Sequence, residues 1–188
     1  MRLLRLLALL FGAVLIAGCQ SSYPPQDPST YKTLVGPYRL DSGDRLRVVV
    51  FGQTDLSNTF LIDQAGYISM PLIGPVAARG RTTQELEGDI AARLKTGRFL
   101  RDPDVSVEVD RYRPFFIMGE VSNSGQYPFV TGMTVQTAVA IAGGFTPRAQ
   151  RNDVDVTRQV NGKVTTIRLL PTQPVFPGDT INVRERLF

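Results

Sequence analysis

Closely spaced acidic side chains are the candidates for acid–base chemistry in this sequence. Asp153 and Asp155 alternate along a β-type run, and Asp102 and Asp104 flank Pro103. Two such carboxylates can share acid–base work, but the general acid must be buried so that its pKa rises. The neighbours of both pairs are polar, which favours surface and turn roles. We therefore predict no catalytic residue, with a carboxylate-dependent hydrolase acting through Asp153 or Asp155 as an alternative.

The residues that are missing exclude several other kinds of site. The 188 residues contain no His, no Trp and one Cys. Nucleophile–His catalysis and Cys/His zinc sites need residues that this sequence lacks, and one cysteine cannot form an internal disulfide. Gly143-Gly144 follows a helical run instead of preceding one, so it does not form a phosphate-binding loop. The sequence predicts no metal and no cofactor. Its 43% apolar and 20% charged residues are typical of a folded protein.

The N-terminus combines a basic start with a short apolar run. Arg2 and Arg5 precede 13 uncharged residues, from Leu6 to Gly18. A membrane-spanning helix needs about 20 apolar residues, so this run indicates a secretory signal peptide over residues 1–18.

The end of this run resembles the lipobox of bacterial lipoproteins. Ala17 and Gly18 are the small residues before the cleavage site, and Cys19 is the only cysteine. The resemblance implies that Cys19 becomes the acylated N-terminus and anchors the protein to a membrane. In Gram-negative lipoproteins, Gln20 at the next position suggests the outer membrane. An ordinary signal peptide with an incidental cysteine is the alternative.

The part after the cysteine begins with a tether and carries a nearly balanced charge. Residues 19–36 are rich in Pro and Ser without apolar periodicity. Without Arg2 and Arg5, 19 basic residues stand against 17 acidic ones, which argues against nucleic-acid binding. Arginines nevertheless gather in short stretches, as solvated surface or as contacts to an acidic polymer or partner. These candidates are Arg79, Arg81, Arg98, Arg101, Arg111 and Arg113.

Residues 37–112 predict a strand-rich first domain. A β-branched run over 46–51 is typical of a strand. Residues 60–62 and 67–73 resemble the two arms of a hairpin around Gly66, with Pro71 restricting the second arm. The alternating valines of residues 105–109 predict a half-buried strand.

One helix is predicted within this domain, over residues 83–96. Thr82 and Glu85 form a capping box. Leu86, Ile90 and Leu94 recur every four residues and give an apolar stripe. Gly97 is suited to the C-cap.

Residues 113–188 predict a second strand-rich domain. A buried strand over 115–121 leads through a turn to a returning strand at 126–130, and Thr134 caps a short helix that ends at Gly143-Gly144. Asn161-Gly162 is a strong hairpin signal that joins residues 153–160 to 163–169. A last strand is predicted at 180–183. The two domains together predict an α+β fold.

A short sequence motif occurs once in each of the two domains. Gly43-Asp44 and Gly178-Asp179 each precede an alternating strand. Glycine permits the turn backbone, and we expect the aspartate to accept hydrogen bonds from the amides that follow it.

The ordered set of these motifs resembles the bacterial polysaccharide export family of the Wza-like type. Residues 38–48, 62–76 and 80–86 resemble its export domain. Residues 119–127, 134–146 and 177–183 resemble a soluble-ligand-binding β-grasp (SLBB) domain. The likeness covers residues 36–186 and rests on turn positions shared with the family: Gly43, Asp44, Gly66, Gly74, Gly80, Gly119, Gly125, Gly143, Gly144, Gly178 and Asp179. Ser42 and Ser124 stand where the family usually has Pro, and Ala65 where Asp is common.

The resemblance implies a non-enzymatic export component facing the periplasm from the outer membrane. It implies a ring-shaped homo-oligomer around an exopolysaccharide or capsular polysaccharide, with an inner-membrane polysaccharide co-polymerase as partner. The sequence stops at Phe188, without the extra repeats and C-terminal helix of pore-forming members. We therefore expect a ring or collar beneath a separate outer-membrane β-barrel protein. The alternatives are a lipoprotein that binds envelope glycan or protein without a conduit, and a histidine-free glycan hydrolase.

Overall fold

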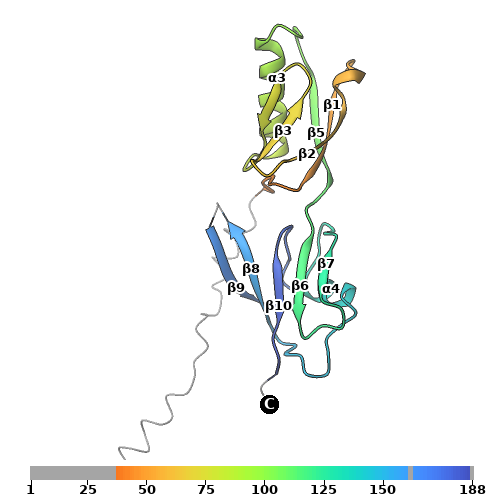
Figure 1. The fold of residues 1–188 in the computed structure, drawn as a ribbon, viewed down its shortest axis with the longest axis vertical. Coiled ribbons are helices and arrows are strands. Elements are labelled where there is room, and N and C mark those ends of the chain that lie inside the picture. The colour runs from red at the N-terminus through yellow and green to blue at the C-terminus, as the bar shows by residue number, and fades with distance from the viewer. Residues whose placement is uncertain (1–36, 161–162, 187–188) are drawn as a thin grey trace, which may run out of the picture.

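The computed structural model describes residues 37–160 and 163–186, which form two domains stacked lengthwise (Figure 1). Each domain encloses its own hydrophobic cluster, one centred on Leu46, Ile68 and Ile90, the other on Phe115, Val156 and Ile181. The lipobox, the tether and the Asn161-Gly162 turn lie outside the described residues. Among the residues described, none of the helices is both long and apolar enough to span a bilayer.

The first domain is built on a three-stranded antiparallel sheet of order β2-β1-β5, comprising β1 (Arg45–Val50), β2 (Asn58–Leu61) and β5 (Val105–Arg111). Burial alternates strictly along β1, where Leu46, Val48 and Val50 face the core. This alternation follows from the two-residue period of a strand. A short 3-10 helix, η1 (Thr54–Leu56), connects β1 to β2.

The amphipathic helix is confirmed with the predicted bounds, as α3 (Thr83–Thr96). Thr82 and Glu85 make both hydrogen bonds of the capping box, and Gly97 is the C-cap residue. The stripe residues Leu86, Ile90 and Leu94 are fully buried. The helix packs against β5, so the sheet is covered on this face.

The predicted hairpin between residues 60–62 and 67–73 is wrong. The turn forms, because the Asp63 amide donates to the Tyr67 carbonyl (2.9 Å) and Gly66 to Asp63 (3.0 Å). The chain then separates: β2 pairs with β1, whereas β3 (Tyr67–Met70) pairs with β4 (Gly74–Ala77) in a sheet of their own. β2 thus becomes a strand of the larger sheet, beside β1. As expected, the strand that begins at Tyr67 ends before Pro71.

The second domain carries a five-stranded mixed sheet of order β7-β6-β10-β8-β9. Its strands are β6 (Phe115–Gly119), β7 (Gly125–Tyr127), β8 (Val154–Val160), β9 (Lys163–Leu169) and β10 (Thr180–Val183). The last strand, β10, lies between β6, to which it is parallel, and β8, to which it is antiparallel. The predicted pairing of residues 153–160 with 163–169 is confirmed as the long hairpin of β8 and β9, in which Val154 lies opposite Leu169.

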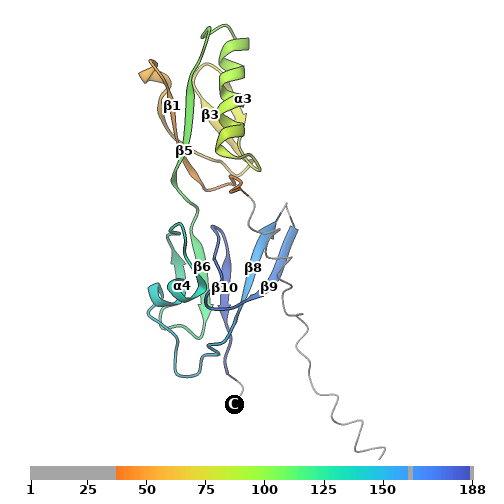
Figure 2. The same cartoon turned by 180° about the vertical axis from the view of Figure 1, so that it is seen from behind.

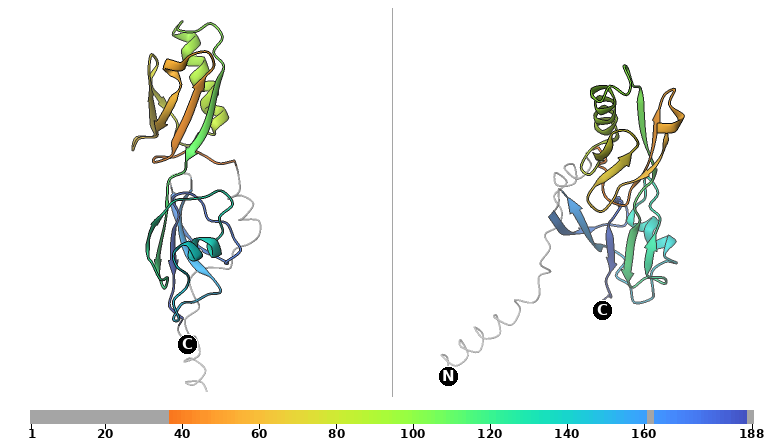
Figure 3. Two further views of the ribbon diagram at one scale, coloured as in Figure 1. Left: turned by 90° about the vertical axis from the view of Figure 1, so that its right-hand side faces the viewer. Right: turned by 45° about the horizontal axis from the view of Figure 1, so that its top comes forward.

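The second helix, α4 (Val135–Ile141), begins at Thr134 through another capping box. It lies across one face of this sheet, seen from the side in Figure 3 and from behind in Figure 2. Its buried residues Val135, Ala138 and Val139 join the core of the second domain. Two helices packed against separate sheets confirm the predicted α+β class.

Candidate functional site

The junction between the domains is organised around the carboxylate of Asp44, which has no exposure to water. Its Oδ1 accepts a hydrogen bond from the Arg113 amide (2.9 Å). Its Oδ2 accepts from the Tyr38 hydroxyl (2.6 Å), the Asp41 amide (2.9 Å) and Arg113 Nη1 (3.2 Å). A buried charge is stable only when it is paired and hydrogen-bonded, so Asp44 ties the entry of β1 to the linker between the domains.

Tyr38 closes this network, because its hydroxyl donates to Asp44 and also accepts from Arg113 Nη1 at 2.9 Å. The Arg113 guanidinium lies 5.9 Å from the centre of the Tyr38 ring. Burial, followed by the nearby Asp44 charge, raises the pKa of the Tyr38 phenol far above its ordinary 10.0. Tyr38 therefore stays protonated and keeps donating to Asp44 across the neutral range.

The second Gly-Asp turn repeats the geometry of the first. In each turn, the aspartate amide donates to the carbonyl three residues earlier at 3.1 Å: Asp44 to Asp41, and Asp179 to Phe176. In each, Oδ2 accepts from that same earlier residue, at 2.9 Å and 2.8 Å. The expectation that these aspartates bind the amides after them is wrong. Their carboxylates instead accept from the amide three residues earlier and so close the turn on its N-terminal side.

The buried Asp179 also forms an ion pair with an arginine, as Asp44 does. Arg158 donates to both of its carboxylate oxygens, through Nε (2.8 Å) and Nη2 (2.6 Å). This two-point pairing is the strong form of an arginine–carboxylate contact. The guanidinium of Arg158 stacks 4.2 Å from the Phe176 ring centre, which covers its remaining face.

Arg113 touches both turns and so fixes one domain against the other. A methyl group added at Gly178 would lie 2.6 Å from Arg113 Nε, and one at Gly43 would lie 3.4 Å from Arg113 Cβ. The Gly178 amide donates to the carbonyl of Pro114 (3.1 Å), beside Arg113 in the linker. The two glycines therefore leave space for one arginine between the domains.

A cavity of about 170 Å³ lies at this junction. The rings of Tyr38 and Tyr112 meet edge to face with centres 5.0 Å apart, and Tyr112 meets Phe129 in the same way at 5.5 Å. The other wall comes from the segments 131–133 and 174–177. This arrangement suits packing of an apolar surface more than proton transfer, because the one phenol close to a carboxylate is already bonded to it.

The structure separates the six candidate arginines. Arg113 lies in the junction, and Arg79 is held beside it, because its Nε contacts Asp41 Oδ1 (3.0 Å) and its Nη2 contacts Ser42 and the Gln64 carbonyl. Arg81 pairs with Asp89 at 3.3 Å. Arg98 and Arg101 are exposed in the loop after α3, at the end of the first domain far from the junction, and Arg111 is exposed at the end of β5.

The turn and carboxylate candidates occupy structural settings. Eight of the nine turn glycines have positive φ, whereas Gly125 begins β7. Asp153 and Asp155 both contact Arg184, and Asp155 also lies 3.3 Å from Arg168. Asp102 and Asp104 are exposed.

Sequence reasoning missed Tyr38 and Arg158. The echo of Gly-Asp turns did point to Asp44 and Asp179. Arg113 lies 69 residues from Asp44, and Arg158 lies 21 residues from Asp179, so no local spacing reveals either pair.

Comparisons with known proteins find two family matches along the chain. Residues 33–110 match the polysaccharide biosynthesis/export protein family, and residues 114–168 match the SLBB domain. The chain is 35% identical to the exopolysaccharide production protein ExoF of Rhizobium meliloti (strain 1021) over 119 residues, which are 57% of this chain and 28% of ExoF.

Two further relatives are named for polysaccharide movement. The EPS I polysaccharide export outer membrane protein EpsA of Ralstonia solanacearum is 27% identical over 92% of this chain and 55% of its own length. The polysialic acid transport protein KpsD of Escherichia coli is 27% identical over 64% of this chain and 22% of its own length. The chain thus spans about half or less of the length of these relatives.

The packing of Arg113 against Gly178 yields a stability prediction. Gly178→Ala places a methyl group against Arg113 in a backbone with φ +84°. We expect a loss of about 2–4 kcal/mol in the free energy of unfolding, from overpacking and left-handed strain together. Gly144→Ala, at φ +89° with open space around it, is the matched control and should lose only about 1–2 kcal/mol. Equal losses of unfolding free energy for the two variants, measured by urea unfolding, would contradict the packing of Arg113 against Gly178.

The buried phenol of Tyr38 predicts a loss of stability in alkali. The unfolded chain releases this proton from about pH 10, whereas the folded protein holds it to a higher pH. The stability contribution is therefore complete below pH 10 and falls above it, by up to about 1.4 kcal/mol per pH unit. Tyr38→Phe should remove this part of the slope in urea unfolding between pH 9 and 11. Tyr67→Phe is the control, because it removes a phenol and keeps Tyr38 with its hydrogen bonds; a Tyr38→Phe slope equal to wild type contradicts the prediction.

Proposed function

Since this chain belongs to the Wza-like family of polysaccharide export proteins, we propose that it is the outer-membrane-anchored, periplasmic component of a machine that exports an exopolysaccharide or capsular polysaccharide. The observation that carries this proposal is the succession of an export domain and an SLBB domain in one chain. Relatives named for exopolysaccharide production and for polysaccharide export and transport support it. The family is one of export proteins and not of enzymes.

We propose further that copies of the chain assemble into a ring through which the polymer passes. Two features support a ring. The two domains are locked lengthwise by Arg113, so each copy is a rigid, elongated unit (Figure 1). Among the described strands, the edges of the two larger sheets are β2 and β5, and β7 and β9. Association of one surface with a different surface of the next copy closes a ring when the rotation fits.

The proposed partners follow from the same role. An inner-membrane polysaccharide co-polymerase would deliver the polymer, and a separate outer-membrane β-barrel protein would carry it across the outer membrane. The ring acts passively in this scheme, as a wide aqueous path between the two.

The cavity at the domain junction favours a second candidate function. Its aromatic walls could hold an envelope glycan or a protein segment, so that the chain would be a lipid-anchored binding module without a conduit. The mass of the purified lipoprotein in detergent separates the two, because a lasting monomer fits only the binding module.

Deletion of the gene tests the proposed function in the cell. We expect surface polysaccharide to disappear while polymer synthesis inside the cell continues, because the path outward is lost. Surface polysaccharide is measured by immunodetection on intact cells and compared with total polymer in lysates. Re-expression of the chain is the control and should restore the surface signal; an unchanged surface signal in the deletion strain counts against export.

Acylation of Cys19 is a separate prediction. In Cys19→Ser, the precursor should remain uncleaved at this site and should incorporate no labelled fatty acid, because acylation needs the thiol. Ser21→Ala, two residues away, should behave as wild type. Metabolic labelling and membrane fractionation measure both variants, and normal fatty-acid labelling of Cys19→Ser would refute the anchor.

A further inference from the structure

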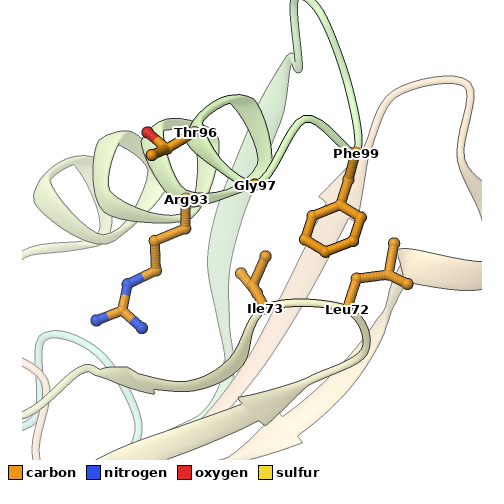
Figure 4. Close-up of a pocket in the computed structure, with 6 residues that line it drawn as sticks. All are labelled: Leu72, Ile73, Arg93, Thr96, Gly97 and Phe99. Atoms are coloured by element: carbon orange, nitrogen blue, oxygen red, sulfur yellow. The ribbon is translucent and has the colours of Figure 1, made fainter.

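A shallow groove lies at the end of the first domain that points away from the second. It is lined by Leu72 and Ile73 of the β3–β4 turn and by Phe99 after α3, and its volume is about 340 Å³ (Figure 4). Leu72 is 58% exposed and Phe99 is 45% exposed. Large apolar side chains gathered in an open groove are typical of a docking surface.

The walls of this groove are held in place by strained backbone. Leu72 has φ +69°, and the amide of Ile73 donates to the Pro71 carbonyl (2.8 Å), which together match the rare γ-turn with a left-handed centre. Between the lining residues Gly97 and Phe99, Arg98 has φ +59°. These are the two non-glycine residues with positive φ among those described. Such strain persists where the surrounding structure enforces it, and it clusters at functional sites.

The end of α3 explains how Phe99 is fixed. The amides of Arg98 and Phe99 donate to the carbonyls of Lys95 and Leu94, each at 3.0 Å, which is the Schellman pattern of helix ends. A methyl group at Gly97 would lie 2.4 Å from the Phe99 ring. Gly97 is therefore needed for close contact with Phe99, while the left-handed position falls on Arg98.

The same domain presents an apolar knob, Phe51, whose residue surface is 80% exposed. Phe51 occupies the corner of a tight turn, closed by the Gln53 amide donating to the Val50 carbonyl (3.0 Å). The Ser57 hydroxyl accepts from the Val50 amide (3.0 Å) and donates to the Gln53 carbonyl (2.8 Å). A side chain held out by a pre-organised turn loses little freedom on binding.

The knob and the groove lie on different sides of the domain and carry opposite charges. The end of β1 with η1 and the helix α3 flank the domain on opposite sides in Figures 1 and 2. Arg98 is exposed beside the groove, and Asp55 is exposed beside the knob, and no ion pair is seen for either within the described part of the chain. The two surfaces are thus both apolar with opposite charges beside them, and they lie on different sides of one copy.

We propose that Phe51 of one copy docks into the groove of Leu72, Ile73 and Phe99 on the next copy, with Asp55 facing Arg98. This contact joins two different surfaces, so repetition around an axis closes a ring. The groove is assigned to a second copy because the chain itself supplies an exposed apolar side chain, Phe51, whose neighbour Asp55 has the charge opposite to that of Arg98. The inference rests on the proposed ring and adds the surface that builds it.

Paired cysteines test this contact in the full-length lipoprotein, whose own cysteine is acylated under the proposed function. Phe51→Cys combined with Leu72→Cys should give a ladder of disulfide-linked oligomers under mild oxidation in detergent. Val130→Cys combined with Leu72→Cys is the matched control, because Val130 is 60% exposed but lies in the second domain; it should give no ladder. Absence of the Phe51–Leu72 ladder would overturn the proposal.

A charge in the knob gives an independent test by native mass measurement. Phe51→Asp should weaken self-association at least tenfold while circular dichroism stays unchanged, because the side chain is exposed in the single copy. Val130→Asp should leave the oligomer mass unaltered.

Three results would overturn the proposal in distinguishable ways. If Phe51→Asp keeps the wild-type mass, another surface closes the ring and the proposed function survives. If Leu72→Asp loses export at unchanged mass, the groove serves a different protein. If the wild-type lipoprotein is itself a monomer, the ring fails as well.

Discussion

A carboxylate that is wholly removed from water is the constraint on which this structure depends. Asp44 can remain buried only because a phenol, two backbone amides and a guanidinium surround it. Those groups come from the entry to β1 and from the linker after β5. Satisfying one charge therefore brings together the start of the first domain and the start of the second.

The second Gly-Asp turn extends this constraint. Asp179 is buried like Asp44 and pairs with its own arginine, yet its neighbour Gly178 also leaves space for Arg113. Two turns with the same backbone geometry thus face each other across one side chain. A rigid junction of this kind would suit the ring proposed above, because every copy in a closed ring must have the same shape.

The sequence predicted local features well because their causes are local. The helix over 83–96 needed only a capping box and a four-residue apolar repeat, and the β8–β9 pairing needed only a turn signal between two alternating runs. The false hairpin at Gly66 shows the limit. Its turn formed, but β2 joined β1, since the partner of a strand is decided by which apolar face completes the core. The arginine partners of Asp44 and Asp179 could not be predicted from the sequence either, because they come from distant parts of the chain.

The position of β10 has a consequence for how the second domain is made. This strand lies between β6 and β8, yet it comes after both in the chain. Until residues 180–183 arrive, β6 and β8 have no common neighbour, and Ile181 and Val183 are missing from the centre of the core. Such late, distant pairing slows folding. During synthesis, the sheet of the second domain can therefore be completed only after residues 180–183 have emerged, whereas the first domain can fold as soon as its last strand, β5, has emerged.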